Sequence, residues 1–151
     1  MLRMKGKKQL TVLFLLAGWL ALTPIAARAQ QDTIRWMTFE EAMKRYDKEH
    51  KKIVVYLHTS WCGHCKIMDT TTFRNPVVVK RLNTEFYAVK MDGEMKDTIK
   101  VGQELYYFDP GMGLRGTHEL AWALMTDQKT PHYPTLTFLD KNFDVYKSYQ
   151  G

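Results

Sequence analysis

The sequence predicts a layered α/β domain. Between residues 34 and 91, strand-like apolar runs alternate with segments of helical period, and this order favours parallel pairing of the strands. Near the end of the chain, two further apolar runs are joined by a short polar turn, which predicts an antiparallel hairpin. The two cysteines of the chain are separated by two residues and lie between a strand and the helix that follows it.

The first 29 residues have the three parts of a secretory signal peptide. A basic segment comes first, an apolar run of 13 residues spans Leu10–Leu22, and the small residues of Ala27-Arg28-Ala29 provide a cleavage site. The apolar run is shorter than the roughly 20 residues that a membrane-spanning helix needs. We therefore expect secretion across the inner membrane, cleavage before Gln30, a periplasmic location and no membrane insertion of the mature chain. An uncleaved N-terminal anchor is the alternative.

The positive charge of the chain belongs mostly to this leader. The whole chain has 22 basic and 16 acidic residues, a net charge of +6, and the leader holds five of the basic residues and none of the acidic ones. The mature chain, residues 30–151, therefore has a net charge of only +1. This charge gives no support to binding of nucleic acid or of an anionic membrane surface. Its 122 residues are enough for one domain with one core, and we expect a monomer.

The first part of the mature chain has clear strand and helix signals. Ile34–Trp36 is predicted as a short first strand. Thr38 and Glu41 form a capping box for an amphipathic helix that runs to about His50. Ile53–Leu57 is a nearly continuous apolar run, which is typical of a central strand that is buried on both sides.

A second strand–helix unit follows the cysteines. Lys66–Thr72 is predicted to continue the helix that begins at the cysteines. Asn75 and Pro76 suit the N-cap and the first position of another helix, which runs to about Asn83. Phe86–Met91 is the next predicted strand.

The remaining part of the chain is predicted to contain two hairpins, one loop and one helix. They are, in order, a short hairpin over residues 99–107, a loop at Asp109–Gly113, a helix from His118 to about Thr126 that Thr117 caps, and a hairpin of the strands Leu136–Leu139 and Val145–Tyr149.

Two motifs point to a chemistry. Trp61-Cys62-Gly63-His64-Cys65-Lys66 follows the central strand, and Tyr133-Pro134-Thr135 precedes the first strand of the last hairpin. In this order and at this separation they resemble the thioredoxin superfamily, and in particular exported bacterial thioredoxin-like proteins with a Cys-Gly-His-Cys site. The resemblance covers about residues 34–151 and includes an insertion between the predicted strand Phe86–Met91 and the proline loop, residues 130–135. It implies a thioredoxin-like fold, in which helices flank a central mixed sheet, and the activity of a protein thiol–disulfide oxidoreductase.

The resemblance also implies the roles of individual residues. Cys62 matches the attacking cysteine of the family and Cys65 the resolving cysteine. Pro134 matches the cis-proline that lies against the disulfide, although Pro131 is a competing candidate in this sequence. Trp61 and Tyr133 would frame the substrate, the latter through main-chain pairing with an extended segment.

Thiol–disulfide exchange at such a motif follows from elementary chemistry and implies no metal or organic cofactor. The N-terminus of a helix favours the thiolate form of Cys62, which attacks a disulfide, and Cys65 then resolves the mixed disulfide. The imidazole of His64 can pair with the Cys62 thiolate and stabilise the reduced form. We therefore predict a reduction potential above the roughly −270 mV of thioredoxin, toward the roughly −180 mV of protein disulfide isomerase.

The sequence departs from the family pattern at two places. Tyr56 stands where thioredoxins have a buried aspartate that helps to deprotonate the resolving cysteine, whereas the lysine that accompanies this aspartate is present as Lys90. Proton transfer from Cys65 would then use water, Lys90 or another group. The family also adds a helix after the last strand, and the sequence ends at Gly151, where that helix would begin. We expect either a longer protein or one face of the sheet with less cover.

Several alternatives stay open at this level. The expected partners are protein thiols or disulfides and a redox partner, which is another thiol protein or a membrane electron donor. Reductase, isomerase and oxidase share these residues, and the redox partner decides among them. A binding or chaperone-like module without redox turnover is the first alternative function. A metal-binding protein is the second, in which His58 and His64 would complete a zinc site with the two cysteines.

Three further features are weaker candidates for function. His132 lies in the proline loop and His118 at the start of a predicted helix, so either imidazole could face the cysteines. The aromatic cluster Tyr106–Phe108 is a candidate for a partner-binding patch, or for packing of the insertion.

Overall fold

The computed structural model describes residues 32–126 and 129–151. The predicted signal peptide, residues 1–29, lies outside the described residues. The elements of the described part are, in chain order, α2 (Phe39–Tyr46), β1 (Lys52–His58), α3 (Gly63–Thr70), the 3₁₀ helix η1 (Thr72–Arg74), α4 (Pro76–Glu85), β2 (Phe86–Asp92), β3 (Ile99–Val101), β4 (Glu104–Tyr106), β5 (Phe108–Asp109), β6 (Thr117–His118), α5 (Glu119–Ala123), β7 (Thr135–Leu139) and β8 (Val145–Gln150).

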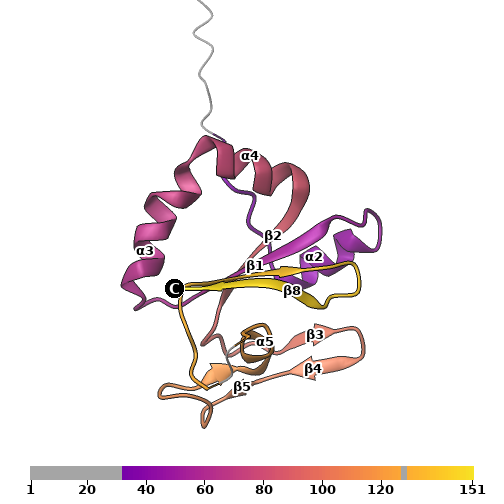
Figure 1. The fold of residues 1–151 in the computed structure, drawn as a ribbon. Coiled ribbons are helices and arrows are strands. Elements are labelled where there is room, and N and C mark those ends of the chain that lie inside the picture. Colours follow the sequence, from indigo (N-terminus) through magenta and orange to yellow (C-terminus); the bar gives the residue numbers. More distant parts are fainter. Residues whose placement is uncertain (1–31, 127–128) are drawn as a thin grey trace, which may run out of the picture. The chain divides into compact units, whose positions relative to one another are not determined.

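Four strands form the central sheet in the order β2-β1-β7-β8 (Figure 1). β1 and β2 run parallel, with Val55 opposite Val89, whereas β7 is antiparallel to β1, with Thr137 opposite Val55. β8 is antiparallel to β7 and completes the predicted hairpin. The sheet is therefore mixed, and the predicted fold class is confirmed.

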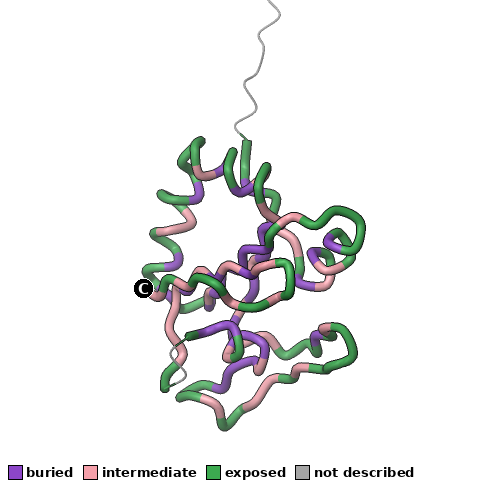
Figure 2. Tube along the Cα trace, turned by 45° about the vertical axis from the view of Figure 1, so that its right-hand side comes forward, coloured by how far each residue is buried: buried purple, intermediate pink, exposed green. Residues whose placement is uncertain are grey.

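Successive residues of β1 divide between the two faces of the sheet, as the pleat of a strand requires. Val54 and Tyr56 belong to one hydrophobic core, which α3, η1 and α4 cover. Ile53, Val55 and Leu57 belong to a second core on the opposite face, which α2, β3 and α5 cover (Figure 1). Buried residues gather along the central strands and on the sides of the elements that face them (Figure 2). Burial on both faces explains why β1 is nearly continuous in its apolar character.

The predicted caps of α2 and α4 are confirmed. The Thr38 hydroxyl accepts a hydrogen bond from the Glu41 amide at 3.2 Å, and the Glu41 carboxylate accepts one from the Thr38 amide at 3.1 Å. At the start of α4, the Asn75 side chain accepts a hydrogen bond from the Val77 amide at 2.9 Å, and Pro76 is the first helical residue. α2 ends at Tyr46, four residues before the predicted end at His50, because residues 47–49 form a turn instead.

The predicted strand at Ile34–Trp36 is wrong. The main chain meets the outer edge of β2 only at Met37, which forms an isolated parallel bridge with Val89. The side chains of Ile34 and Trp36 instead pack into the core under α3 and α4. The apolar residues of this segment therefore mark core contacts and not a strand of the sheet.

The insertion contains the predicted hairpin, β3–β4, and a second pair of very short strands that was not predicted, β5–β6. Thr117 belongs to β6, so the prediction that it caps the next helix is wrong. His118 is the N-cap of α5, since its Nδ1 accepts a hydrogen bond from the Leu120 amide at 3.2 Å. α5 ends at Ala123 and not at Thr126.

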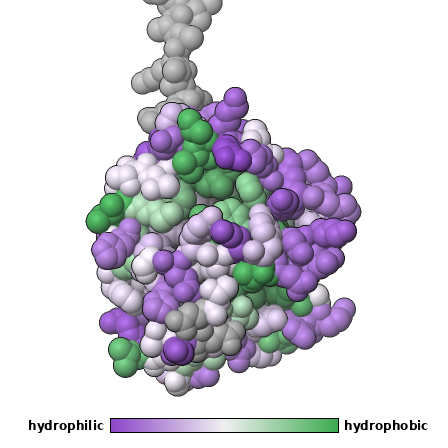
Figure 3. Space-filling view, viewed as in Figure 1, coloured by the Kyte–Doolittle hydropathy of each residue, from purple (hydrophilic) through white to green (hydrophobic). Residues whose placement is uncertain are grey.

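Within residues 32–126 and 129–151, no helix is long and apolar enough to cross a membrane. On the face seen in Figure 3, hydrophilic residues cover the region over α2 and the turn that leads from it into β1. This turn, residues 47–51, is rich in lysine and acidic residues, so it is a solvated part of the surface.

Candidate active site

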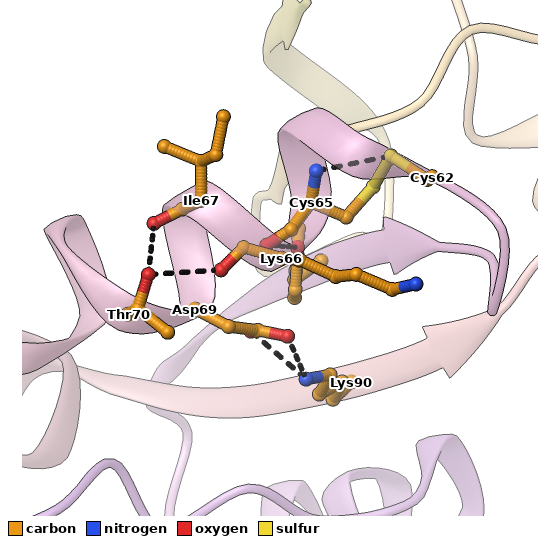
Figure 4. Close-up of polar contacts among 8 residues, drawn as sticks. Cys62, Cys65, Lys66, Ile67, Asp69, Thr70 and Lys90 are labelled. Atoms are coloured by element: carbon orange, nitrogen blue, oxygen red, sulfur yellow. Dashed lines mark hydrogen bonds and ion pairs between the residues drawn. A yellow bond between two sulfur atoms is a disulfide. The ribbon is translucent and has the colours of Figure 1, made fainter.

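The two cysteines form a disulfide at the start of α3 (Figure 4), with their Cα atoms 5.3 Å apart. Cys62 is the N-cap of α3, and its sulfur accepts a hydrogen bond from the Cys65 amide at 3.0 Å. A helix N-terminus carries a partial positive charge and unpaired amide groups. The arrangement therefore stabilises negative charge on the Cys62 sulfur when the disulfide opens, as exchange chemistry requires.

Both cysteines are buried, whereas their neighbours in the motif are not. Cys62 keeps 4% of its surface exposed and Cys65 keeps 2%. Trp61 and His64 are exposed on either side of Cys62 in the sequence. The His64 ring makes no hydrogen bond to another residue of the described part while the disulfide is closed. Its pairing with the Cys62 thiolate stays a prediction for the reduced form.

The proline loop contains the cis peptide bond, and it lies between Tyr133 and Pro134 rather than at Pro131. The Tyr133 ring is edge-on to the Trp61 ring, with centroids 6.0 Å apart, so the two predicted framing residues are in contact. The ring also packs against Gly93, where a Cβ atom would overlap it. Burial raises the pKa of the Tyr133 phenol to about 12.

Tyr56 occupies the centre of the sheet face beneath α3 and is fully buried. Its hydroxyl donates a hydrogen bond to the main-chain oxygen of Cys65 at 3.2 Å. Burial raises the pKa of this phenol far above its ordinary value, and the negative charge of Asp69 raises it further. The phenol therefore stays protonated at any physiological pH and cannot serve as the base for Cys65.

Lys90 and Asp69 form an ion pair (Figure 4). The Lys90 ammonium lies 2.9 Å from both carboxylate oxygens of Asp69 and 5.3 Å from the centre of the Tyr56 ring. Asp69 lies four residues after Cys65, on the same face of α3. A pocket of about 370 Å³, which Trp36 also lines, brings solvent to the pair.

Asp69 is the residue of this site that sequence reasoning missed. Two signals pointed to it: its spacing of one helical turn from Cys65, and a lysine on the strand that pairs with β1. Lys90 is opposite Tyr56 in the parallel register, which brings its side chain to the face that α3 covers. The acid that accompanies the lysine therefore comes from the helix and not from β1.

The remaining histidine candidates lie in different surroundings. His118 is fully buried, and its Nε2 lies 3.0 Å from the main-chain oxygen of Asp97. This contact joins two parts of the insertion, so the residue has a structural role there. His132 forms a hydrogen bond with the Thr130 hydroxyl at 3.1 Å. His58 stacks on the Tyr56 ring, and burial lowers its pKa, with the charge of Lys90 lowering it further. Among the residues that the structure describes, no three histidine, cysteine or acidic side chains are grouped as metal ligands.

The fold and the disulfide at a helix start define the class of thioredoxin-fold proteins. Within this class, residues 21–145 match the family model Thioredox_DsbH, which is described as a protein of unknown function, DUF255, and the chain belongs to this family. No curated protein matches the chain.

Several solved structures share this fold. A DsbH oxidoreductase is 19% identical and has a TM-score of 0.53, with 85% of this chain and 77% of that chain covered. A putative disulphide-isomerase from Bacteroides thetaiotaomicron is 28% identical and has a TM-score of 0.52, with 82% and 84% covered. A thioredoxin from Thermus thermophilus is 21% identical and has a TM-score of 0.54, with 79% and 76% covered. Together, the fold, the family and the cysteine pair fit thiol–disulfide exchange.

Proposed function

We propose that this chain is an exported thiol–disulfide oxidoreductase that exchanges disulfides with the cysteines of other proteins. The observation that carries the proposal is the Cys62–Cys65 disulfide at the start of α3, with the Cys65 amide directed at the Cys62 sulfur. The cis Tyr133–Pro134 bond and the contact between Tyr133 and Trp61 support a substrate site next to this disulfide.

In the reducing direction, the Cys62 thiolate attacks one sulfur of a substrate disulfide. A bond forms between the two sulfurs, the substrate disulfide breaks, and its other sulfur leaves as a thiolate. Cys65 then attacks the Cys62 sulfur, which closes the Cys62–Cys65 disulfide and releases the second substrate thiolate. The substrate gains two electrons and the chain loses two. The same steps in reverse oxidise a dithiol substrate.

Cys65 has to lose its proton before it attacks, and the Asp69 carboxylate is its proposed acceptor, directly or through a water molecule. Asp69 follows Cys65 by one turn of α3, and solvent reaches it through the pocket that it lines with Lys90. The Lys90 ammonium contacts this carboxylate at 2.9 Å. Tyr56 holds the main chain of Cys65 in place and takes no proton.

The partner and the compartment are parts of the same proposal. The leader sends the chain to the periplasm, where a second thiol protein or a membrane electron donor resets the cysteine pair after each turnover. N-terminal sequencing of the exported chain tests the leader: we expect Gln30 as the first residue. A full-length chain retained in the membrane would favour the anchor instead.

Reduction of insulin with dithiothreitol as the electron donor tests the exchange activity. We expect the wild-type chain to accelerate the reaction and Cys62→Ser to abolish the acceleration. Ser60→Ala is the matched control, because it alters the segment before the motif without removing a sulfur, and it should keep the activity. A wild-type chain that exchanges disulfides with neither insulin nor glutathione would overturn the proposal.

Elemental analysis tests the metal-binding alternative. Zinc in the anaerobically purified, reduced chain would support that alternative.

A further inference from the structure

A groove of about 280 Å³ lies between the end of the insertion and the proline loop. Trp61, which directly precedes Cys62, forms one wall, and Tyr133 and Pro131 form another. The third wall comes from the insertion through Leu114 and Arg115. The groove therefore shares Trp61 and Tyr133 with the proposed exchange site and has a wall that belongs to the insertion.

Two glycines shape this wall of the groove, Gly113 against the proline loop and Gly116 within the insertion. Gly113 has a φ of 75°, and a Cβ atom there would lie 2.9 Å from the ring of Pro131. Gly116 has a φ of 81° and packs against the Phe108 ring so closely that a Cβ atom would overlap it. Because side chains rarely adopt such φ values, the close approach of this segment depends on glycine. The wall of the groove is thus built into the fold of the insertion.

The charged groups at the groove are engaged with each other and with Trp61. The Trp61 indole N–H donates a hydrogen bond to the Glu94 carboxylate at 3.0 Å, and the Arg115 guanidinium lies 5.5 Å from the centre of the indole ring. Arg115 also lies 3.5 Å from the same carboxylate. These contacts fix the orientation of the indole and leave an apolar surface for a ligand.

An uncovered leucine stands at the rim of this surface. Leu114 is fully exposed, and the Trp61 side chain is half-exposed. Exposed apolar groups that meet at one concave site mark a place where a partner buries apolar surface.

We infer that the groove binds a bulky apolar side chain, leucine or phenylalanine, that lies within a few residues of the reacting cysteine in an extended segment of the substrate protein. The inference rests on the proposed function. Its occupant follows from the two residues that the groove shares with the exchange site, Trp61 and Tyr133, and from the exposed apolar surface of Trp61 and Leu114. The insertion would therefore select among protein disulfides by the residues that flank the cysteine.

The test uses two disulfide-linked peptides of equal length and charge, one with leucine and one with serine beside the cysteine, together with glutathione disulfide. We expect the reduced wild-type chain to react faster with the leucine peptide. Leu114→Asn should lower kcat/KM for this peptide about five- to tenfold, the size expected for a partly buried leucine contact. Its reaction with the serine peptide and with glutathione should change little.

Leu105→Asn is the matched control, because Leu105 is also an exposed leucine of the insertion but lies on β4, outside the groove lining. It should leave all three reactions unchanged. Equal rates of the wild-type chain with the two peptides, or an equal loss with glutathione in Leu114→Asn, would overturn the inference while the exchange activity stands. Dimerisation in sedimentation that Leu114→Asn abolishes would assign the groove to a second copy of the chain. Absence of any reaction, even with glutathione, would instead overturn the proposed function.

Discussion

The substitution Tyr56→Phe removes one hydroxyl from the centre of the site and leaves the ring in place. The hydroxyl donates to the Cys65 main-chain oxygen at 3.2 Å, and the ring packs against Trp36 and Phe73 with centroids 5.7 and 4.7 Å apart. Loss of one buried hydrogen bond costs about 1 kcal/mol, because the ring packing is retained. For a domain of this size, that cost lowers Tm by about 3–6 °C.

The same substitution is expected to leave the chemistry nearly unchanged. The phenol is protonated and bound to a carbonyl oxygen, so it has no proton-accepting role to lose. Insulin reduction by Tyr56→Phe should stay within about twofold of wild type between pH 6 and 9, because general-base effects are much larger than this. Asp69→Asn should slow the step in which Cys65 resolves the mixed disulfide by about tenfold or more, since it removes the proposed proton acceptor.

Lys90→Met is the control that distinguishes the effect of the ion pair from the effect of the Asp69 carboxylate itself. It breaks the pair but keeps the acid, so we expect a stability loss of about 1 kcal/mol or less, as is usual for partly exposed pairs, with turnover largely retained. Stopped-flow measurement of the resolving step and thermal unfolding provide the two readouts. A large rate loss in Tyr56→Phe together with a normal rate in Asp69→Asn would refute this assignment.

Three further predictions concern the motif, the fold and the pH dependence of stability. His64→Pro should lower the reduction potential by about 30 mV, which corresponds to about 1.4 kcal/mol for this two-electron couple; an unchanged value in a glutathione titration would exclude the tuning role. Asn75→Ala should lower the free energy of unfolding by about 1 kcal/mol through loss of the N-cap of α4, and urea unfolding that shows no loss would contradict the cap. The folded state lowers the pKa of both His58 and His118 below 6.5, so the unfolded state binds more protons and the oxidised chain should lose stability as the pH falls below about 6.5. Urea unfolding at several pH values should show a weaker loss in His58→Gln, and an unchanged slope would count against the assignment.

The sequence was sufficient to predict the parts of the fold that depend on local patterns. The capping box at Thr38 and the Asn75-Pro76 start of α4 depend on neighbouring residues, and both are present in the structure. The apolar run of β1 predicted a strand buried on both faces, and each face has a core. The family resemblance added the mixed sheet and the position of the proline loop.

Other features depend on contacts between distant residues, which local patterns do not contain. Ile34 and Trp36 have the spacing of a strand, but their side chains pack into the core that α3, η1 and α4 form with the sheet. The pairing of Lys90 with Asp69 required the register of β1 and β2 and the orientation of α3. The groove beside Trp61 depends on how the insertion folds back onto the proline loop, which no local spacing indicates.

Trapping of the mixed disulfide tests the central claim most directly. The variant Cys65→Ser cannot resolve the intermediate, so incubation of its reduced form with a disulfide peptide should give a stable adduct on Cys62. Peptide mapping by mass spectrometry identifies the modified residue. The account predicts an adduct on Cys62 with Cys65→Ser and little or none on Cys65 with Cys62→Ser. Absence of an adduct on Cys62, or equal trapping by both variants, would contradict the claim that Cys62 is the attacking cysteine of an exchange site.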